Sequence, residues 1–347
     1  REYVPVGLAT ASLLSTPPNR RHPTLWAENV WVFGIVSAWG RWSEWGGESG
    51  AMTSLINQVS KPLARLAGLA LWLLLFTAAV AGGERALLFE ISAPAAPPCY
   101  LFGTFHSEDP RVLALSPATR DAFERSPVFI LEMIPDARTM TRSMEIMVYG
   151  DGRELARVVG APLYGRLVAA LAELGLPEAA IRGFKPWAAA TLLALPPART
   201  GEFLDIHLYR TALAAGKEVI GLETIEEQVA VFDSLGEEDQ ILMLKETLDI
   251  RHQLPLILER LLAAYLDRDL TALARLGDDY LGQGDPGLAE NFRRAALDDR
   301  NPRMAARLEA PLRAGGCFIA VGALHLPGAE GLLARLGRAG WSVRAVE

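Results

Sequence analysis

Cys99-Tyr-Leu-Phe-Gly-Thr-Phe-His106 decides the fold, because Cys317-Phe-Ile-Ala-Val-Gly-Ala-Leu-His325 repeats its layout near the end of the chain. Each stretch is a short apolar run that ends in Gly-x-x-His. Two further apolar runs between them end in the carboxylates Glu132 and Glu223. The loop-helix segment that follows the first run favours parallel pairing, so we expect all four runs to be strands with a common direction. Their carboxyl ends then meet at one edge of a sheet, which gathers two imidazoles and two carboxylates.

The composition sets broad limits on the class of protein. Half of the 347 residues are apolar, 22% are charged, and the formal net charge is -7. Such a chain can bury a large core and is too apolar for a disordered protein. The sequence has no basic stripe interleaved with aromatic residues, which argues against nucleic acid as a partner.

The N-terminal part differs in character from the rest. Residues 1–51 hold five of the eight Trp without a sustained period. Residues 52–81 carry a short basic region, an apolar run and the cleavage pattern Ala79-Val-Ala81, which together predict a secretory signal peptide. We expect residues 1–51 to be sequence upstream of the true start codon, or else a disordered leader before an internal signal anchor. The mature chain, residues 82–347, is then periplasmic or secreted and has no membrane contact after cleavage.

The two cysteines would enter an oxidising environment after export. Cys99 lies four residues before its Gly and Cys317 lies five before its own. If the two Gly-x-x-His motifs align in parallel strands, this offset sends the thiols to opposite faces of the sheet. We therefore expect buried free thiols, with a disulfide as the alternative if the register shifts.

The pattern from about residue 136 to residue 304 is mostly helical and is interrupted by one strand that ends at Glu223. Ser116-Pro117 predicts a helix start earlier in the chain, with Ser as the N-cap and Pro at the first helical position. We predict an α/β (or α+β) fold in one domain, residues 82–347. It has a central, mostly parallel sheet, flanking helices and a large helical insertion at about 136–304.

The four groups at the sheet edge suit a catalytic divalent metal. His106, His325, Glu132 and Glu223 are the predicted ligands, and manganese, cobalt or zinc is the predicted ion. One of the two Glu would bind the metal while the other acts as general base for a bound water, and the sequence leaves open which does which. The Gly of each motif would allow a sharp turn and a close approach of another group.

Several candidate residues can also be explained by a purely structural role. Glu223 precedes Thr224 and could serve only to cap the next helix, and Arg300-Asn301 precedes a helix expected near Pro302. Arg300 suits a clamp for a substrate carboxylate or a buried Asp, but capping and a surface ion pair explain it equally well. Asp205 lies in an apolar helix face, where its carboxylate needs a partner.

Several stretches together resemble one known family, the TraB/GumN family. They extend from about Leu87 to Val346 and are Tyr100–His106 with Asp109-Pro110-Arg111, Phe129–Glu132, Lys185-Pro186-Trp187, Leu204-Asp205, Gly221–Glu223 with Glu227-Gln228, Arg300-Asn301 with Met304, and Val321–His325. That family is related to the Tiki metalloproteases, which carry two Gly-x-x-His motifs. The resemblance implies that His106, Glu132, Glu223 and His325 form the metal and catalytic set and that Arg300 and Asn301 support it. The first motif departs from the family in its third position, where Phe105 stands in place of a smaller residue.

The sequence hypothesis is therefore a periplasmic metal-dependent hydrolase, with a peptide or protein as substrate. The alternative, from another class, is a protein that binds a peptide or signal without cleaving it, as pheromone shutdown proteins of the resembling family do. The oligomeric state is not indicated by the sequence.

Overall fold

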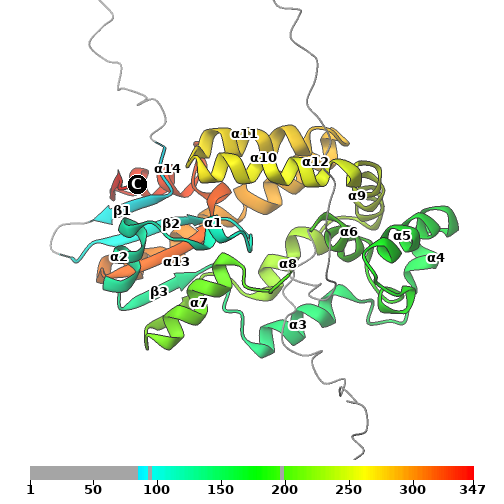
Figure 1. Cartoon of the computed structure of the whole chain (residues 1–347), viewed down its shortest axis with the longest axis horizontal. Coiled ribbons are helices and arrows are strands. Elements are labelled where there is room, and N and C mark those ends of the chain that lie inside the picture. Colours follow the sequence, from blue (N-terminus) through cyan, green and yellow to red (C-terminus); the bar gives the residue numbers. More distant parts are fainter. Residues whose placement is uncertain (1–84, 93–95, 196–198) are drawn as a thin grey trace, which may run out of the picture.

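Figure 1 shows the chain as a computed structural model, which describes residues 85–92, 96–195 and 199–347. The predicted leader and signal peptide, residues 1–51 and 52–81, lie outside the described residues. Within the described ranges, no helix has both the length and the apolar character that a bilayer crossing needs.

A six-stranded sheet forms the centre of one half of the molecule, in the order β4-β3-β5-β2-β1-β6. The strands are β1 (Leu88–Ser92), β2 (Cys99–Thr104), β3 (Val128–Leu131), β4 (Glu218–Gly221), β5 (Cys317–Gly322) and β6 (Ser342–Ala345). The pairs β2–β5, β5–β3 and β3–β4 are parallel, whereas β1 runs antiparallel to both β2 and β6. The predicted α/β fold with a mostly parallel sheet is confirmed, and the four runs that end in His or Glu share one direction.

The register between β2 and β5 differs from the expected one. Tyr100 pairs with Phe318 and Gly103 pairs with Val321, so the two Gly-x-x-His motifs are out of step by one residue. Cys99 and Cys317 are level instead, and the amide N of Cys317 donates to the Cys99 Sγ at 3.3 Å. The expectation that the thiols point to opposite faces was wrong, because the pairing of the apolar residues, and not the motif, sets the register. Both cysteines are buried free thiols.

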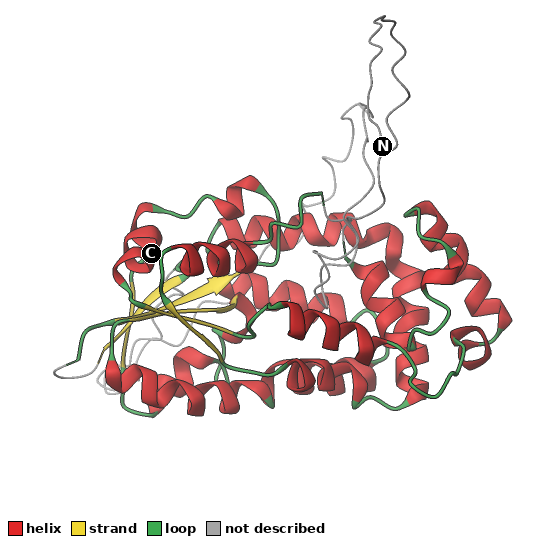
Figure 2. Cartoon of the chain, turned by 90° about the horizontal axis from the view of Figure 1, so that it is seen from below, coloured by secondary structure: helices red, strands yellow, loops and turns green. Residues whose placement is uncertain are grey.

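Helices cover both faces of the sheet, as Figure 2 shows. The helices whose apolar side chains join the core around the sheet are α1 (Pro110–Leu113), α2 (Pro117–Arg125), α7 (Leu204–Ala214), α10 (Leu254–Leu266), α11 (Leu270–Leu281), α13 (Arg300–Ala314) and α14 (Leu332–Arg338). Helix α2 begins as predicted, with the Ser116 hydroxyl accepting from the Thr119 amide and Pro117 at the first helical position. Burial on both faces explains why β2 and β5 read as continuous apolar runs.

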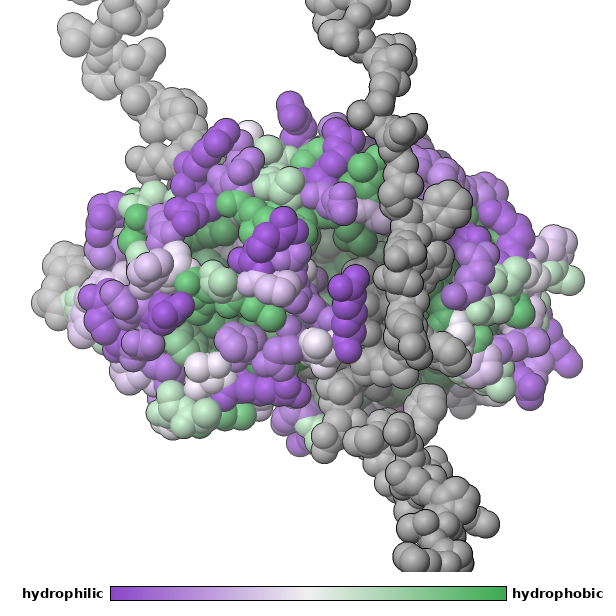
Figure 3. Space-filling model, viewed as in Figure 1, coloured by the Kyte–Doolittle hydropathy of each residue, from purple (hydrophilic) through white to green (hydrophobic). Residues whose placement is uncertain are grey.

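A second apolar core lies beyond the carboxyl ends of the parallel strands, on the right in Figure 1. The helices that contribute to it are α3 (Ala137–Met147), α4 (Leu155–Val159), α5 (Ala161–Glu173), α6 (Pro186–Ala194), α8 (Ile225–Asp233), α9 (Glu237–Ile250) and α12 (Pro286–Arg293). Short turns of other helix types complete the chain: η1 (Glu178–Ala180), η2 (Arg251–Gln253), η3 (Arg294–Asp298) and η4 (Ala323–His325). Trp187 at the start of α6 is fully buried and stacks on Phe232 of α8 at 5.2 Å between ring centroids. Figure 3 shows that hydrophilic side chains cover much of the described surface on one face, with apolar patches between them.

Candidate functional site

Glu132 and Glu223 lie side by side because the ladder between β3 and β4 continues past the strand ends. The amide N of Glu223 donates to the carbonyl O of Glu132 at 2.7 Å. Both carboxylates therefore leave the sheet at the same edge, where the parallel strands end. The structure thus places the two acidic residues of the predicted site next to each other.

Arg300, at the start of α13, joins these two carboxylates. Its Nη2 lies 2.7 Å from Glu132 Oε2 and 2.5 Å from Glu223 Oε2, and its Nε donates to Glu223 as well. Arg303 Nη2 donates to the other oxygen of Glu223 at 2.8 Å. The Glu223 side chain has no exposed surface, so its charge needs these cations. Glu223 is thereby neutralised on both oxygens, which suits a structural or positioning role.

Glu132 is held differently and remains partly open, with 23% of its side chain exposed. Its Oε1 accepts from the amide of Gly322 at 2.7 Å, and its Oε2 accepts from Gln228 Nε2 at 3.1 Å. Burial opposes its ionisation, but Arg300, His325 and the Gly322 amide outweigh this effect and lower the pKa of Glu132 to about 2. Glu132 is therefore a carboxylate at neutral pH.

His325 faces Glu132 from the turn η4, directly after β5. Its Nδ1 lies 2.6 Å from Asn301 Oδ1, and Asn301 Nδ2 donates to the carbonyl of Glu330 at 3.0 Å. The second bond fixes the orientation of the amide, so Oδ1 is the acceptor and His325 Nδ1 carries the hydrogen. Burial lowers the pKa of His325, which favours the neutral ring with a lone pair on Nε2.

The lone pair of His325 Nε2 points towards an anion. Nε2 lies 3.7 Å from Glu132 Oε1, too far for a hydrogen bond. Two electron-rich atoms at this separation suit a cation between them, since metal bonds to imidazole nitrogen and carboxylate oxygen are about 2.0–2.2 Å long. The Asn301 contact is the kind of outer-shell bond that fixes the tautomer of a ligating histidine. The chemistry of this donor pair therefore fits a divalent ion that keeps its other positions for water or substrate.

His106, after β2, belongs to a second group of side chains. Its Nδ1 lies 3.3 Å from Asp205 Oδ2, and the other oxygen of Asp205 accepts from the Thr104 hydroxyl at 2.7 Å. The imidazole stacks on the Phe203 ring at 4.3 Å with 7° between the planes. Asp205, in the first turn of α7, finds in His106 and Thr104 the partners that its place in an apolar helix face demands. Stacking on Phe203 fixes the plane of the His106 ring, and the contact with Asp205 fixes the position of its Nδ1.

The predicted site residues thus fall into two groups. Glu132, Glu223 and His325 form one connected network with Arg300 and Asn301, while the contacts described for His106 are with Asp205 and Phe203. In the ranges that the structure describes, no three His, Cys, Asp or Glu side chains are grouped closely enough to hold one metal ion. Of the predicted ligands, the pair His325–Glu132 has a described separation that matches a metal site.

The glycines of the motifs allow the two strand ends to pack closely. A Cβ on Gly103 would lie 2.8 Å from Leu326 Cδ1 and 3.1 Å from Ala323 Cα, so only glycine lets the η4 turn rest on β2. A Cβ on Gly322 would lie 3.2 Å from Glu132 Oε1. The second glycine therefore leaves room for the carboxylate that its own amide binds.

Three side chains at the site were not predicted to be there. Gln228 and Arg303 bind the two carboxylates, and Asp205 binds His106. Arg300, Arg303 and Arg307 recur at helical spacing on α13, so a row of Arg on one helix face was the available signal. Gln228 lies in one of the stretches that carry the family resemblance, but a single polar residue on a helix does not by itself indicate a contact with Glu132.

Comparison with known families and proteins gives one match. The model of the TraB/PrgY/gumN family matches residues 87–345, which is most of the chain. No curated protein and no solved structure matched the chain in the same comparisons.

Proposed function

We propose, from the premise that the chain belongs to the TraB/PrgY/gumN family, that it is a metal-dependent hydrolase that cleaves peptides. One observation carries the proposal: the Nε2 of the buried His325 lies 3.7 Å from Oε1 of Glu132, while burial lowers the pKa of His325 and so favours its neutral ring. Neither a hydrogen bond nor an ion pair with a neutral ring explains this approach, whereas a cation between the two atoms does. We propose manganese, cobalt or zinc as that cation.

His325 and Glu132 would hold the ion in this proposal. When bound there, such an ion lowers the pKa of a water molecule and polarises a carbonyl group, which is the chemistry of metal-assisted hydrolysis. Asn301 orients the His325 ring, and the Gly322 amide and Gln228 fix the Glu132 carboxylate. The chain thus supports both donors through contacts that are already made.

Glu223 is assigned to positioning in this proposal. Its oxygens are held by Arg300 and Arg303, so neither is available to a metal or a proton. Its role is to hold Arg300 in place, and Arg300 in turn holds Glu132. Of the two roles that the sequence left open for the pair of Glu, the role of ligand goes to Glu132.

His106 is assigned to proton transfer. A carboxylate on one ring nitrogen fixes the orientation of the imidazole and leaves the other nitrogen to exchange the proton. Asp205 supplies that carboxylate, and the stack on Phe203 fixes the plane of the ring. His106 would accept or return the proton that the hydrolysis moves.

The test combines metal binding with peptide cleavage in four proteins. The wild-type protein, His325→Ala, His106→Ala and, as a matched control, His252→Ala in the exposed turn η2 are compared. We expect one divalent ion per chain and cleavage in manganese, cobalt or zinc for the wild type and for His252→Ala. His325→Ala should lose the ion, whereas His106→Ala should keep it and lose at least about a hundredfold in kcat.

The outcomes separate hydrolysis from binding. If no ion binds and no peptide is cleaved while peptides still bind, the protein is a peptide or signal binder and the hydrolase proposal is wrong. If His106→Ala loses the ion as well, His106 is a ligand, and the proton-transfer role fails. We also propose that the protein acts in the periplasm after export, which fractionation of the producing cell would test.

A further inference from the structure

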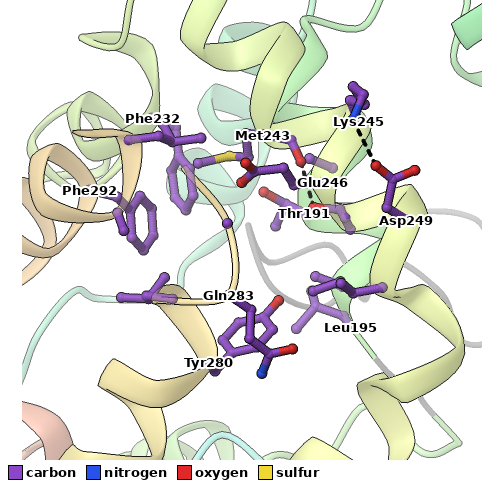
Figure 4. Close-up of a pocket in the computed structure, with 18 residues that line it drawn as sticks. Thr191, Leu195, Phe232, Met243, Lys245, Glu246, Asp249, Tyr280, Gln283 and Phe292 are labelled. Carbon is purple, nitrogen blue, oxygen red and sulfur yellow. Dashed lines mark hydrogen bonds and ion pairs between the residues drawn. The ribbon is translucent and has the colours of Figure 1, made fainter. Parts of the chain in front are cut away.

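A cavity of about 440 Å³ lies among the helices of the second core, and we call it the helical pocket. Residues of α6, α8, α9, α11 and α12 line it. Figure 4 shows Phe232 and Phe292 on one side of the cavity and Leu195 on the opposite side, with Met243 between them. Its size lies within the range of pockets that hold small molecules, and such pockets are mostly apolar with a few polar groups.

Helix α8 connects the helical pocket to the candidate site. Gln228 binds Glu132, and Phe232, four residues further along α8, lines the pocket. Residues i and i+4 lie on the same face of a helix about 6 Å apart along its axis. The pocket therefore begins about one helical turn from the side chain that contacts the proposed metal ligand.

The walls of the helical pocket favour an apolar occupant. Phe232 and Phe292 line one side with their rings tilted at 50° and their centroids 5.5 Å apart, and Trp187 stacks behind Phe232 at 5.2 Å. Ala194 and Ala289 keep the opposing helices from filling the space, because each presents only a methyl group to it. Apolar surface of this kind gains free energy when an apolar side chain replaces the water inside it.

One carboxylate makes the helical pocket selective by charge. Glu246 lines the cavity, and its Oε1 accepts from the amide of Asp285 at 2.7 Å. Among the described residues no Lys, Arg or His forms an ion pair with Glu246, whereas Asp249 on the rim is paired with Lys245 and Arg166. Burial and the nearby Glu246 charge raise the pKa of Tyr280, so its phenol stays neutral. An acidic group entering the pocket would meet the Glu246 charge, while Lys245, which also lines the cavity, is already paired with Asp249.

We propose that the helical pocket is the subsite that binds a large apolar side chain of the peptide substrate and rejects an acidic one. The proposal rests on the proposed function and adds a substrate class to it. A leucine or phenylalanine side chain would fill the cavity against Phe232 and Phe292, while the peptide backbone extends along α8 towards Glu132. Glu246 then sets the preference against aspartate and glutamate.

The first experiment measures cleavage of a peptide library by the protein loaded with metal. The library starts from one constant peptide. In each member a single position is replaced by phenylalanine, leucine, serine or aspartate, and every position is tested in this way. At one position, kcat/KM should be at least about tenfold higher for phenylalanine or leucine than for serine, and lowest for aspartate. Glu246→Gln should raise the value for aspartate relative to that for phenylalanine.

Variants that fill the helical pocket test whether it binds the apolar side chain. Ala289→Trp places a large side chain in the cavity, whereas Glu290→Trp places the same side chain at the next position of α12, which is exposed. Ala289→Trp should reduce the ratio of kcat/KM for phenylalanine to that for serine to about one, and Glu290→Trp should keep the wild-type ratio. If Ala289→Trp does not fold, Ala194→Phe fills the cavity from α6. An unchanged preference in a folded, filled variant overturns the proposal.

A second experiment keeps the proposal testable if no peptide is cleaved. Titration calorimetry compares binding of the phenylalanine and serine peptides to the wild type and to the filled variant. Tighter binding of the phenylalanine peptide by about tenfold, lost in the filled variant, supports the helical pocket even though the hydrolase proposal has failed. Equal affinities of the two peptides for the wild type overturn the pocket proposal in both cases.

Discussion

Asn301 shows how a residue that need not touch the metal or the substrate shapes the site. It is 2% exposed, and both ends of its amide are used, one by His325 and one by the carbonyl of Glu330. Because the amide cannot turn over without losing both bonds, the His325 tautomer is fixed. The hydrogen bond at Nδ1, on the far side of the ring, therefore leaves the lone pair of His325 on Nε2.

Replacing Asn301 should weaken both the proposed metal site and the fold. Asn301→Ala removes the acceptor for His325 Nδ1, and loss of such an outer-shell partner lowers metal affinity by about 10–100-fold. We expect the free energy of unfolding to fall by about 1–3 kcal/mol, because buried partners lose their hydrogen bonds. Calorimetric titration with manganese measures the affinity, and urea unfolding measures the stability.

Two further variants serve as controls for Asn301→Ala. Asn301→Asp keeps an acceptor for His325 and should retain most of the metal affinity. Asn291→Ala removes an exposed amide on α12 that contacts only Arg294 among the side-chain hydrogen bonds described, and should leave both measurements unchanged. Equal metal affinity in wild type and Asn301→Ala would show that the His325 ring needs no such support.

The limits of the sequence are clearest at Glu223. Its position after an apolar strand predicted correctly that it would lie at the sheet edge beside Glu132. Its charge partners, Arg300 and Arg303, are 77 and 80 residues away in the chain, and no spacing rule connects them to it. A ligand and a neutralised ion pair have the same sequence signature, and only the folded arrangement separates them.

At the scale of elements, the start of α8 is fixed by a capping box. Thr224 accepts from the Glu227 amide, and Glu227 accepts from the Thr224 amide in return. Arg307 of α13 binds the same Glu227 carboxylate and also donates to the carbonyl of Leu222 at 2.6 Å. The box and the arginine together join α8, α13 and the end of β4, which are the elements that carry Gln228, Arg300 and Glu223.

This junction should weaken in acid. Hydrogen bonds from Arg307, opposed in part by burial and helped by the Thr224 amide, lower the pKa of Glu227 from 4.5 to about 2. A carboxyl group whose pKa is lower in the folded state stabilises the fold above its unfolded pKa, and that stability is lost as the pH falls from about 4.5 to about 2. Glu227→Gln should therefore cost about 1 kcal/mol at pH 7 and progressively less below pH 4.5.

Urea unfolding of both proteins at pH 7, 4 and 3 measures this difference. Glu238→Gln is the matched control, because Glu238 is exposed at the start of α9 and forms no ion pair among the described residues. A gap between wild type and Glu227→Gln that stays constant from pH 7 to pH 3 would contradict the assigned pKa.

Element types were easier to predict than element pairing. The apolar runs, the Ser116-Pro117 helix start and the parallel direction of four strands follow from local patterns and from crossover geometry. The register of β2 against β5 does not, because both strands are buried on both faces and a shift of one residue leaves the apolar pattern intact. The repeated Gly-x-x-His therefore suggested an alignment that the packed sheet does not have.

At the scale of the whole molecule, the order of the strands in the sheet determines which strands hold the two halves of the sheet together. β5 lies at the centre of the sheet between β2 and β3, yet it is the fifth strand in the chain, and its Cys317 contacts Cys99 across 218 positions. β6 lies at the edge and pairs only with β1 in the described sheet. Removal of β6 alone should therefore destabilise the fold much less than removal of β5 as well.

Two truncations test this difference. A chain that ends at Gly340 loses β6 but keeps every parallel pair, and we expect it to unfold cooperatively at a lower urea concentration than the full chain. A chain that ends at Gly315 loses β5 as well, which separates β1–β2 from β3–β4, and we expect no cooperative unfolding transition. Circular dichroism against urea measures both, and a cooperative transition in the shorter chain would contradict the central role of β5.

The position of β5 also determines when the proposed metal-binding pair can form during synthesis. The chain emerges from its N-terminus, so β1–β2 and β3–β4 are available long before the strand that joins them. Gly322 at the end of β5 binds Glu132, and His325 follows three residues later. The strand that completes the sheet therefore also completes the proposed metal-binding pair, so under the proposed function an unfinished chain would be inactive.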